Sequence, residues 1–189
     1  MPFDHFDIIS GLYNRIAKYS PPARLLDLLD LPPNGLLLDA GGGTGRVAEA
    51  LRLMVREVVV ADLSRGMLRH AVDKSLTTTC APVELLPFAS ETFDRIIIVD
   101  ALHHVLDMGE AITELWRVLA PGGRIFIIEP DIHKFVVKLI ATGEKILLMR
   151  SHFLTAENIS TLLARQNTQV RVVLEEFNVW VYADKGREM

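Results

Sequence analysis

Cysteine is almost absent from this chain of 189 residues, in which Cys80 is the only one. A single cysteine excludes an internal disulfide and leaves no basis for a cysteine-ligated zinc site. Proteins of oxidising compartments commonly carry disulfides, whereas those of the cytoplasm do not. The cysteine content therefore favours a cytoplasmic location.

Positive charge and long apolar runs are also lacking. The formal net charge is −4 at pH 7, which argues against a nucleic acid as partner, because such binders neutralise phosphates with Lys and Arg. No apolar run approaches the ~20 residues of a membrane-spanning helix. Residues 1–7 are acidic and contain no basic segment ahead of an apolar one, so we expect no signal peptide.

Hydrophobic residues, in contrast, make up 50% of the chain. At this length they predict one domain, residues 1–189, with a large core. Apolar runs without alternation are separated by helical patterns, which is typical of a parallel sheet covered on both faces. We expect strands at Leu36–Asp39, Glu57–Ala61, Val83–Leu86, Arg95–Val99 and Arg124–Glu129, and helices at Ala23–Leu31, Arg46–Met54, Arg65–Asp73 and Met108–Leu119.

The C-terminal part differs, because Gln169–Glu175 and Asn178–Asp184 have the pattern of two strands joined by a short turn. So short a connection requires an antiparallel pair. The fold class that follows is α/β, a Rossmann-like, doubly wound mixed sheet that is parallel except for an antiparallel strand of the C-terminal hairpin.

The most informative segment is residues 36–45, LLLDAGGGTG, in which an apolar run ends in a carboxylate and a glycine-rich turn follows. Strand, glycine turn and helix form the nucleotide-binding start of a doubly wound sheet. Gly41, Gly43 and Gly45 are two residues apart, whereas the dinucleotide fingerprint has its third glycine where this chain has Arg46. This spacing weakens the dinucleotide interpretation, and the missing Lys-Ser/Thr pair excludes a P-loop.

Asp39-x-Gly41-x-Gly43-x-Gly45 resembles the first motif of class I S-adenosylmethionine-dependent methyltransferases. The resemblance implies S-adenosylmethionine as cofactor, S-adenosylhomocysteine as product and a sheet of seven strands. It also implies that Gly41, Gly42 and Gly43 pass under the methionine part of the cofactor, while Asp39 helps to order its amino end. A generic glycine-rich turn is the alternative.

Asp62 follows the second expected strand, 17 residues after Gly45. A carboxylate there can accept hydrogen bonds from two adjacent ribose hydroxyls, and the family places its ribose-binding acid at this position. The alternative is a helix cap, with Asp62 or Ser64 at the start of the next helix. The resemblance further implies that Leu63 and Met67 pack on the adenine ring, and packing in the core is the alternative for both.

Residues 86–94, LPFASETFD, resemble the segment that precedes the fourth strand in many small methyltransferases. In that family an Asp four residues before the Leu often holds the adenine amino group, and here that position is Pro82. The side-chain hydrogen bond is therefore lost. Backbone groups around Ala81 and Val83 remain as candidate contacts, so we place Ala81 and Pro82 in the expected cofactor site.

Asp100-Ala101-Leu102-His103-His104 follows the fourth expected strand. Ligands of open α/β sheets bind beyond the carboxyl ends of the strands, so we expect Asp100 to contact the cofactor. His103 or His104 is the candidate base that takes a proton from the methyl acceptor. The alternative is that one histidine binds cofactor or backbone and the other caps the next helix. No second cluster at ligand spacing supports a metal site.

Residues 6–14, FDIISGLYN, resemble the F-D-x-I-A-x-x-Y-D segment of ubiquinone/menaquinone-biosynthesis C-methyltransferases, with Asn14 where that family has Asp. The resemblance implies a lid that closes over the cofactor and excludes water. Tyr13 is the candidate residue of this lid and of the catalytic site. The alternative is an amphipathic helix packed on the edge of the sheet.

Ile132 to Phe153 is the expected substrate-side insertion, with Lys134, Lys138 and Lys145 on one stripe of a continuous helix. A basic amphipathic helix can lie on an anionic membrane, which allows peripheral membrane contact. A pocket wall with solvated lysines is the alternative that we favour. We thus expect N-terminal lid helices (1–35), a cofactor-binding core (36–129), the insertion (130–155), and a C-terminal helix and hairpin (156–189).

These observations predict methyl transfer from S-adenosylmethionine to a small-molecule acceptor, and a quinone or lipid precursor suits the resemblance of the N-terminus. A non-catalytic protein that binds S-adenosylmethionine or S-adenosylhomocysteine is the alternative, because Pro82 replaces the adenine-binding Asp. A nicotinamide-dependent dehydrogenase fits the glycine spacing less well. The sequence leaves open whether the protein is a monomer or a homodimer.

Overall fold

The computed structural model describes residues 19–132, 154–165 and 168–187. Its strands are β1 (Leu36–Ala40), β2 (Glu57–Asp62), β3 (Thr77–Cys80), β4 (Phe93–Val99), β5 (Leu119–Pro130), β6 (Val170–Glu175) and β7 (Asn178–Asp184). Its helices are α2 (Ala23–Leu29), α3 (Arg46–Leu51), α4 (Arg65–Asp73), the short 3-10 helix η1 (Leu102–His104), α5 (Met108–Val118) and α7 (Ala156–Leu163).

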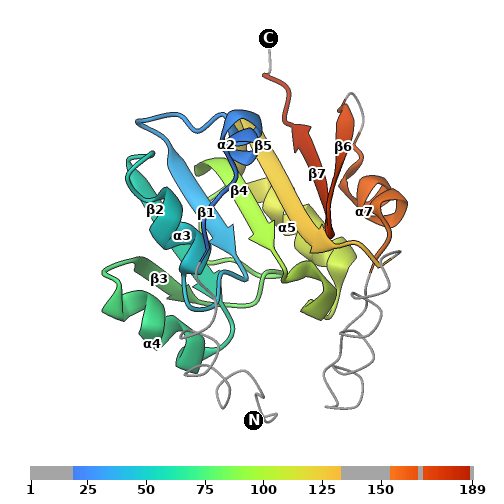
Figure 1. Ribbon diagram of the computed structural model, residues 1–189. Coiled ribbons are helices and arrows are strands. Elements are labelled where there is room, and N and C mark those ends of the chain that lie inside the picture. The colour runs from blue at the N-terminus through green and yellow to red at the C-terminus, as the bar shows by residue number, and fades with distance from the viewer. Residues whose placement is uncertain (1–18, 133–153, 166–167, 188–189) are drawn as a thin grey trace.

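The seven strands form one sheet in the order β3-β2-β1-β4-β5-β7-β6 (Figure 1). The pairs from β3 to β5 are parallel, and β7 runs antiparallel to both β5 and β6. This arrangement confirms the expected doubly wound mixed sheet. The strand order reverses between β1 and β4, because β2 and β3 add to one side of β1 whereas β4 and β5 add to the other.

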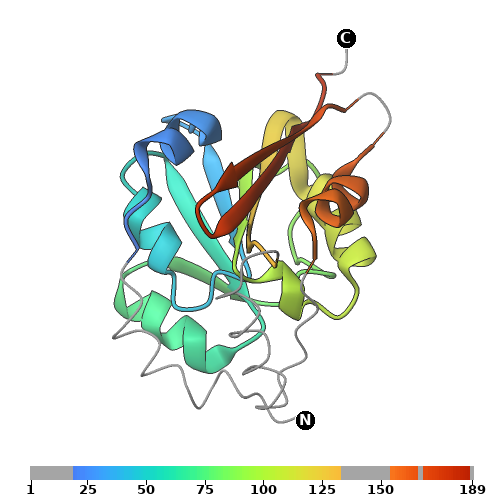
Figure 2. The same ribbon diagram turned by 45° about the vertical axis from the view of Figure 1, so that its right-hand side comes forward.

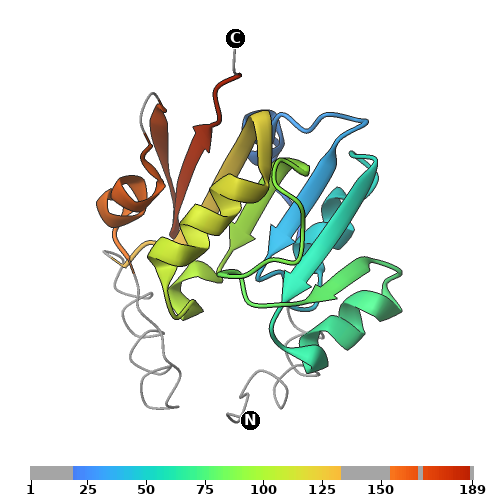
Figure 3. The ribbon, with the colours of Figure 1, turned by 180° about the vertical axis from the view of Figure 1, so that it is seen from behind.

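Helices cover both faces of the sheet, and successive residues of each central strand enter different cores. Leu37 and Ile97 pack with α2, α3 and α4, whereas Leu38 and Ile96 pack with α5 and α7. Figure 3 shows α5 lying across the second face, and Figure 2 shows α2 and α7 on opposite sides of the β6–β7 ribbon. Burial on both faces explains why these strands are apolar without alternation.

The prediction of a third strand at Val83–Leu86 is wrong. The strand is β3, which pairs with β2 from Val59–Thr77 to Asp62–Cys80. As an edge strand with partly exposed side chains, β3 is polar in sequence and lacks the apolar signal. Val83 and Leu86 are buried instead in the core beside α5, from the loop that joins β3 to β4.

Several element ends also differ from expectation. Helix α2 ends at Leu29, because Asp30 takes a left-handed conformation with φ of 48°. Helix α3 ends at Leu51 and not at Met54. Strand β5 begins at Leu119 and not at Arg124, and its first part includes Gly122, whose N–H donates to the carbonyl of Lys185 at 2.9 Å.

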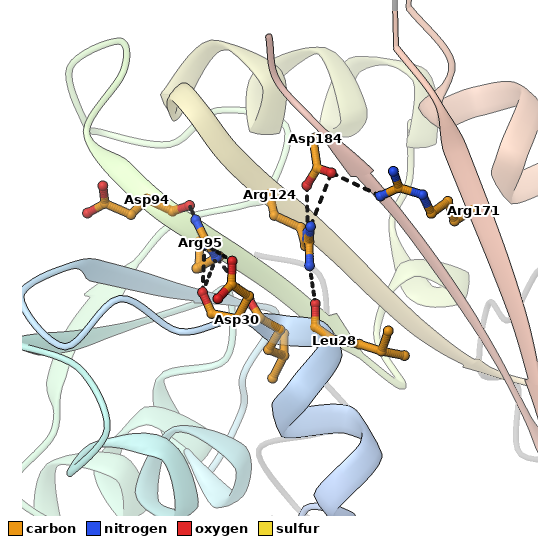
Figure 4. Close-up of polar contacts among 8 residues, drawn as sticks. Leu28, Asp30, Asp94, Arg95, Arg124, Arg171 and Asp184 are labelled. Carbon is orange, nitrogen blue, oxygen red and sulfur yellow. Dashed lines mark hydrogen bonds and ion pairs between the residues drawn. The ribbon is translucent and has the colours of Figure 1, made fainter. Parts of the chain in front are cut away.

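Arginines from β4 and β5 hold the C-terminal end of α2 at the amino edge of the parallel strands (Figure 4). Arg95 donates from Nε to the carbonyl of Leu29 at 2.9 Å and from Nη2 to that of Asp30 at 2.6 Å. Arg124 donates to the carbonyl of Leu28 and pairs with Asp184 at 2.5 Å. The last carbonyls of a helix lack partners within it, so these arginines fix the position of α2 on the sheet.

Within the described ranges, the model contains no helix with the length and apolar character needed to cross a bilayer.

Candidate active site

The carboxyl ends of β1, β2, β4 and β5 lie at one edge of the sheet, on both sides of the reversal between β1 and β4 (Figure 1). Ligands of open α/β sheets bind at such an edge. Asp39 is the penultimate residue of β1, Asp62 is the last residue of β2 and Asp100 follows β4. The structure thus brings these three expected site residues to the same edge.

The glycine turn connects β1 to α3 and depends on left-handed backbone conformations. Gly41, Gly43 and Gly45 have φ of 70°, 54° and 70°, which explains why glycines recur at every second position. A Cβ on Gly41 would come within 2.7 Å of the Cβ of Ala101, so the turn lies directly against the loop that follows β4.

Gly42 and Gly43 face different surroundings. A Cβ on Gly42 would lie 2.6 Å from Cγ of Asp39, so the turn is packed against this carboxyl group. A Cβ on Gly43 would find its nearest neighbours at 3.8 Å, Oδ2 of Asp62, and at 4.0 Å, Sδ of Met67. The turn is therefore tightly packed beneath Gly42 and leaves room beside Gly43.

Asp39 is buried, with 1% of its surface exposed. Its Oδ2 accepts the N–H of Ala48 at 3.2 Å, whereas its Oδ1 has no hydrogen-bond partner in the described part of the chain. Burial raises the pKa of Asp39 to about 7, and the charge of Arg46 opposes this rise. A carboxyl group with an unpaired buried oxygen is costly for folding, which is typical of a functional position.

Arg46 connects the glycine turn to the loop after β4. Its guanidinium pairs with Oδ2 of Asp100 at 2.6 Å and lies 5.2 Å from the ring centroid of Tyr19. Burial raises the pKa of Tyr19 to about 12, so this phenol stays protonated. In the sequence, Arg46 is notable only as a departure from the dinucleotide fingerprint. Its place in the first turn of a helix that follows a glycine turn was the available signal.

Asp62 binds two backbone groups of the loops beside it. Its Oδ2 accepts the N–H of Gly43 and its Oδ1 accepts the N–H of Ser64, both at 2.8 Å. The cap of α4 is Ser64, which accepts the N–H of Met67 at 3.2 Å, so the alternative of Asp62 as the cap is wrong. Because an ionised carboxylate offers about four acceptor positions, Asp62 can bind these amides and further donors.

The expected adenine contacts separate into exposed and buried residues. Leu63 is 63% exposed beside Asp62, whereas Met67 is buried, with 4% exposed. Ala81 is also buried, and its N–H donates to the carbonyl of Asp62 at 3.1 Å. Pro82 is partly buried and opens the turn to Leu85. Leu63 thus offers an exposed apolar surface, whereas Met67 and Ala81 belong to the buried interior.

The two histidines of η1 differ in environment. His103 is 3% exposed and its Nδ1 lies 2.5 Å from Oε2 of Glu129, the penultimate residue of β5. The partly buried ring of His104 lies over that of His103, with centroids 4.0 Å apart. Burial, together with the charge of His103, lowers the pKa of His104 to about 3. Asp107 caps α5 by accepting the N–H of Glu110 at 2.9 Å, so neither histidine is that cap.

Glu84 and Glu129 are site-edge carboxylates that the sequence analysis missed. Oε1 of Glu84 accepts the N–H groups of Leu106 and Asp107 at 3.0 and 3.2 Å, which joins the loop after β3 to the start of α5. Glu129 likewise joins the end of β5 to the loop after β4. Its position at the carboxyl end of an expected strand was a signal that could have found it.

Two expectations lie outside the described residues: Tyr13 with the N-terminal lid, and the insertion with its lysine stripe. In residues 19–132, 154–165 and 168–187, no three His, Cys, Asp or Glu side chains gather in an arrangement suited to a metal ion.

The part of the chain that forms this edge is similar to known proteins. The family model described as a methyltransferase domain matches residues 38–127, which include the glycine turn, Asp62 and η1. This match, together with the relatives described next, supports the similarity of the chain to class I S-adenosylmethionine-dependent methyltransferases. The sequence resemblance seen in the first motif is thereby confirmed.

Curated methyltransferases match much of this domain. The demethylmenaquinone methyltransferase of Corynebacterium urealyticum is 36% identical over 133 residues, which are 70% of this chain and 57% of the relative. The ubiquinone/menaquinone biosynthesis C-methyltransferase of Syntrophotalea carbinolica is 43% identical over 139 residues, which are 67% and 59% of the two chains. The match therefore spans less than two thirds of either relative.

Solved structures confirm the fold of the domain. A SAM-dependent methyltransferase from Thermotoga maritima gives a TM-score of 0.76 at 21% identity and covers 95% of this chain and 98% of its own. The methyltransferase solved in complex with the Trm112 methyltransferase activator, from Haloferax volcanii, gives 0.80 at 14% identity and covers 99% and 100%. At these identities the likeness concerns the fold.

Proposed function

We propose that this domain transfers a methyl group from S-adenosylmethionine to a small-molecule acceptor, with a quinone precursor as the first class to test. The observation that carries the proposal is the edge at which the glycine turn, Asp62 and the loop after β4 come together. The proposal is supported by the names of the two curated relatives, both of which are methyltransferases of quinone biosynthesis.

The methionine part of the cofactor would lie on the glycine turn. Gly43 leaves room for a ligand, and the unpaired buried oxygen of Asp39 lies beneath the same turn. An amino acid group presents both an ammonium and a carboxylate. We assign the ammonium to the side of Asp39 and Asp100, and the carboxylate to Arg46, whose guanidinium suits a carboxylate partner.

The adenosine part would lie over Asp62 and Leu63. Asp62 is held by the N–H groups of Gly43 and Ser64, so its carboxylate would be fixed in place before it binds ribose hydroxyls. The exposed side chain of Leu63 would pack on one face of adenine. Pro82 supplies no side-chain donor or acceptor, so the exocyclic amino group of adenine would depend on backbone carbonyls near Ala81.

When bound, S-adenosylmethionine supplies a methyl group made electrophilic by a positively charged sulfur. The protein then has to align an acceptor and exclude water. A base is needed only for an acceptor that still carries its proton. His104, which its lowered pKa keeps neutral at physiological pH, would not repel a cationic cofactor and can accept a hydrogen bond. We propose His103 and His104 as the residues on the acceptor side, with Tyr13 as the candidate from the N-terminal segment.

Calorimetric titration with S-adenosylmethionine and S-adenosylhomocysteine, with NADH as control, tests the first half of the proposal. We expect micromolar binding of the two sulfur compounds and none of NADH. Incubation with methyl-labelled S-adenosylmethionine and demethylmenaquinol then tests transfer. Binding of NADH alone would contradict the proposal. Binding of both sulfur compounds without transfer to any quinol or lipid precursor would favour the non-catalytic alternative.

A further inference from the structure

Glu129 is a buried acid that contacts the loop after the neighbouring strand. It is 2% exposed. Its Oε1 accepts the N–H groups of Ala101 and Leu102 at 3.1 and 2.7 Å, and its Oε2 lies 2.5 Å from Nδ1 of His103. All three contacts fall on consecutive residues after β4. A single carboxylate thus connects the end of β5 to the segment that contains both histidines.

The backbone of this segment depends on the contact. Asp100 has a left-handed conformation with φ of 54°, and its N–H donates to the carbonyl of Ile128 at 2.9 Å. The next two N–H groups are those that Glu129 accepts. They stand at the start of η1, where no helical carbonyl can receive them. Glu129 therefore fixes the turn that places Asp100 against Arg46.

The imidazole of His103 is fixed by the same group. A carboxylate oxygen at 2.5 Å from Nδ1 requires a proton on that nitrogen. The contact sets both the orientation of the ring and the nitrogen that carries the proton. The ring of His104 packs on that of His103 at 4.0 Å with 48° between their planes, so its placement follows from the first contact.

We propose that Glu129 is a positioning residue for methyl transfer: it holds His103 protonated at Nδ1 and, through that ring, places His104 beside the acceptor. The role rests on the proposed function. Glu129 itself contacts neither acceptor nor cofactor, because its carboxylate is enclosed by the backbone and by His103. Its effect on catalysis is the arrangement of the loop from Asp100 to His104.

The isosteric change Glu129→Gln separates this role from a purely structural one. The amide oxygen of Gln can still accept the N–H groups of Ala101 and Leu102, so the turn is kept. The amide nitrogen, however, donates toward Nδ1 of His103 and requires that nitrogen to be unprotonated. Long-range proton–nitrogen NMR of the imidazoles reports the change. We expect Nδ1 of His103 to be protonated in the parent protein and unprotonated in the variant.

We expect Glu129→Gln to slow methyl transfer and to leave cofactor binding nearly unchanged. With demethylmenaquinol as acceptor, kcat of Glu129→Gln should fall at least about tenfold, an effect of the size seen when a catalytic group is misplaced. KM for S-adenosylmethionine and the Kd for S-adenosylhomocysteine should stay within about threefold. Glu114→Gln is the matched control, since Glu114 also accepts a backbone N–H, that of Leu86 at 2.8 Å, and pairs with a side chain, Arg117.

The outcomes are distinguishable. Unchanged protonation of His103, or an unchanged kcat beside a working parent protein, overturns the role of Glu129 and leaves the proposed function intact. A folded parent protein that binds neither sulfur compound overturns the proposed function itself.

If Glu129→Gln does not fold, His103→Gln keeps an amide donor for Glu129 and removes the ring. The same loss of kcat with retained S-adenosylhomocysteine binding is then expected, and full activity would contradict the role.

Discussion

Asp39 shows how a residue of the proposed binding site can oppose stability. Its pKa of about 7 in the folded protein lies above its ordinary value of 3.8. The folded state therefore retains a proton that the unfolded chain releases between these values. The contribution of Asp39 to stability is therefore greatest below about pH 4, declines as the pH rises toward 7 and then levels off.

Asp39→Asn should remove this pH dependence. At pH 8 we expect the free energy of unfolding to rise by about 2–4 kcal/mol, because a buried charge is replaced by a neutral amide of the same shape. At pH 4 the variant and the parent should differ little. Urea unfolding at both pH values measures the difference, and Asp73→Asn on the exposed side of α4 controls for the loss of one charge. Parallel stability curves would show that Asp39 is not the group that titrates.

Asp62→Ala should weaken S-adenosylmethionine binding by about 1–3 kcal/mol, through the loss of charged hydrogen bonds. The variant also frees the N–H groups of Gly43 and Ser64, so part of the loss comes from a glycine turn that is no longer held. Calorimetry on folded protein measures the Kd, with Asp73→Ala as the control. A Kd equal to that of the parent would remove Asp62 from the site.

At the scale of elements, α2 depends on arginines from strands far from it in the sequence. Arg124→Leu should lower the free energy of unfolding by about 1–3 kcal/mol, because it leaves the carbonyl of Leu28 without its donor and Asp184 without its bidentate partner. Arg171→Leu is the matched control: Arg171 also contacts Asp184 and the ring of Tyr182, but it is 47% exposed. Its loss should cost at most about 1 kcal/mol, and equal costs would contradict the assignment.

The sequence was informative for elements buried on both faces and misleading at the edge of the sheet. The strands from β1 to β5 other than β3 were predicted because parallel strands covered by helices are continuously apolar. Strand β3 reads Thr-Thr-Thr-Cys and pairs with β2 at the edge of the sheet. Because its side chains are not buried in a core, they need not be apolar, and the sequence gives no strand signal. Val83 and Leu86 carried the apolar pattern from a loop instead.

The same distinction holds for the candidate site. Asp39, Asp62 and Asp100 were predictable because each ends or follows an apolar strand, and the carboxyl ends of parallel strands meet at one edge. Arg46 and Glu129 were missed because their roles depend on partners far along the chain. Arg46 pairs with a residue 54 positions away, and Glu129 binds the N–H of a residue 27 positions away. The local sequence indicates only the position of each residue, at the start of a helix or the end of a strand, whereas the contact itself follows from the topology.

For the whole molecule, ligand binding should appear as thermal stabilisation. At a concentration of 100 times Kd, a ligand that binds only the folded state adds about 2.7 kcal/mol. For a domain of this size that corresponds to a rise in Tm of about 5–10 °C. S-adenosylhomocysteine should produce this shift in a thermal unfolding experiment, and NADH at the same concentration should not. A Tm that does not change at saturation would contradict binding at the folded site.

The reversal of strand order gives this edge a particular electrostatic character. Four strands each contribute an acid near their carboxyl end: Asp39, Asp62, Asp100 and Glu129. S-adenosylmethionine carries one net positive charge, whereas S-adenosylhomocysteine carries none. Each turnover would therefore remove, close to these carboxyl groups, the charge that attracted the reactant, which favours release of the product. Added salt, which screens such attraction, should narrow the difference in affinity between the two compounds.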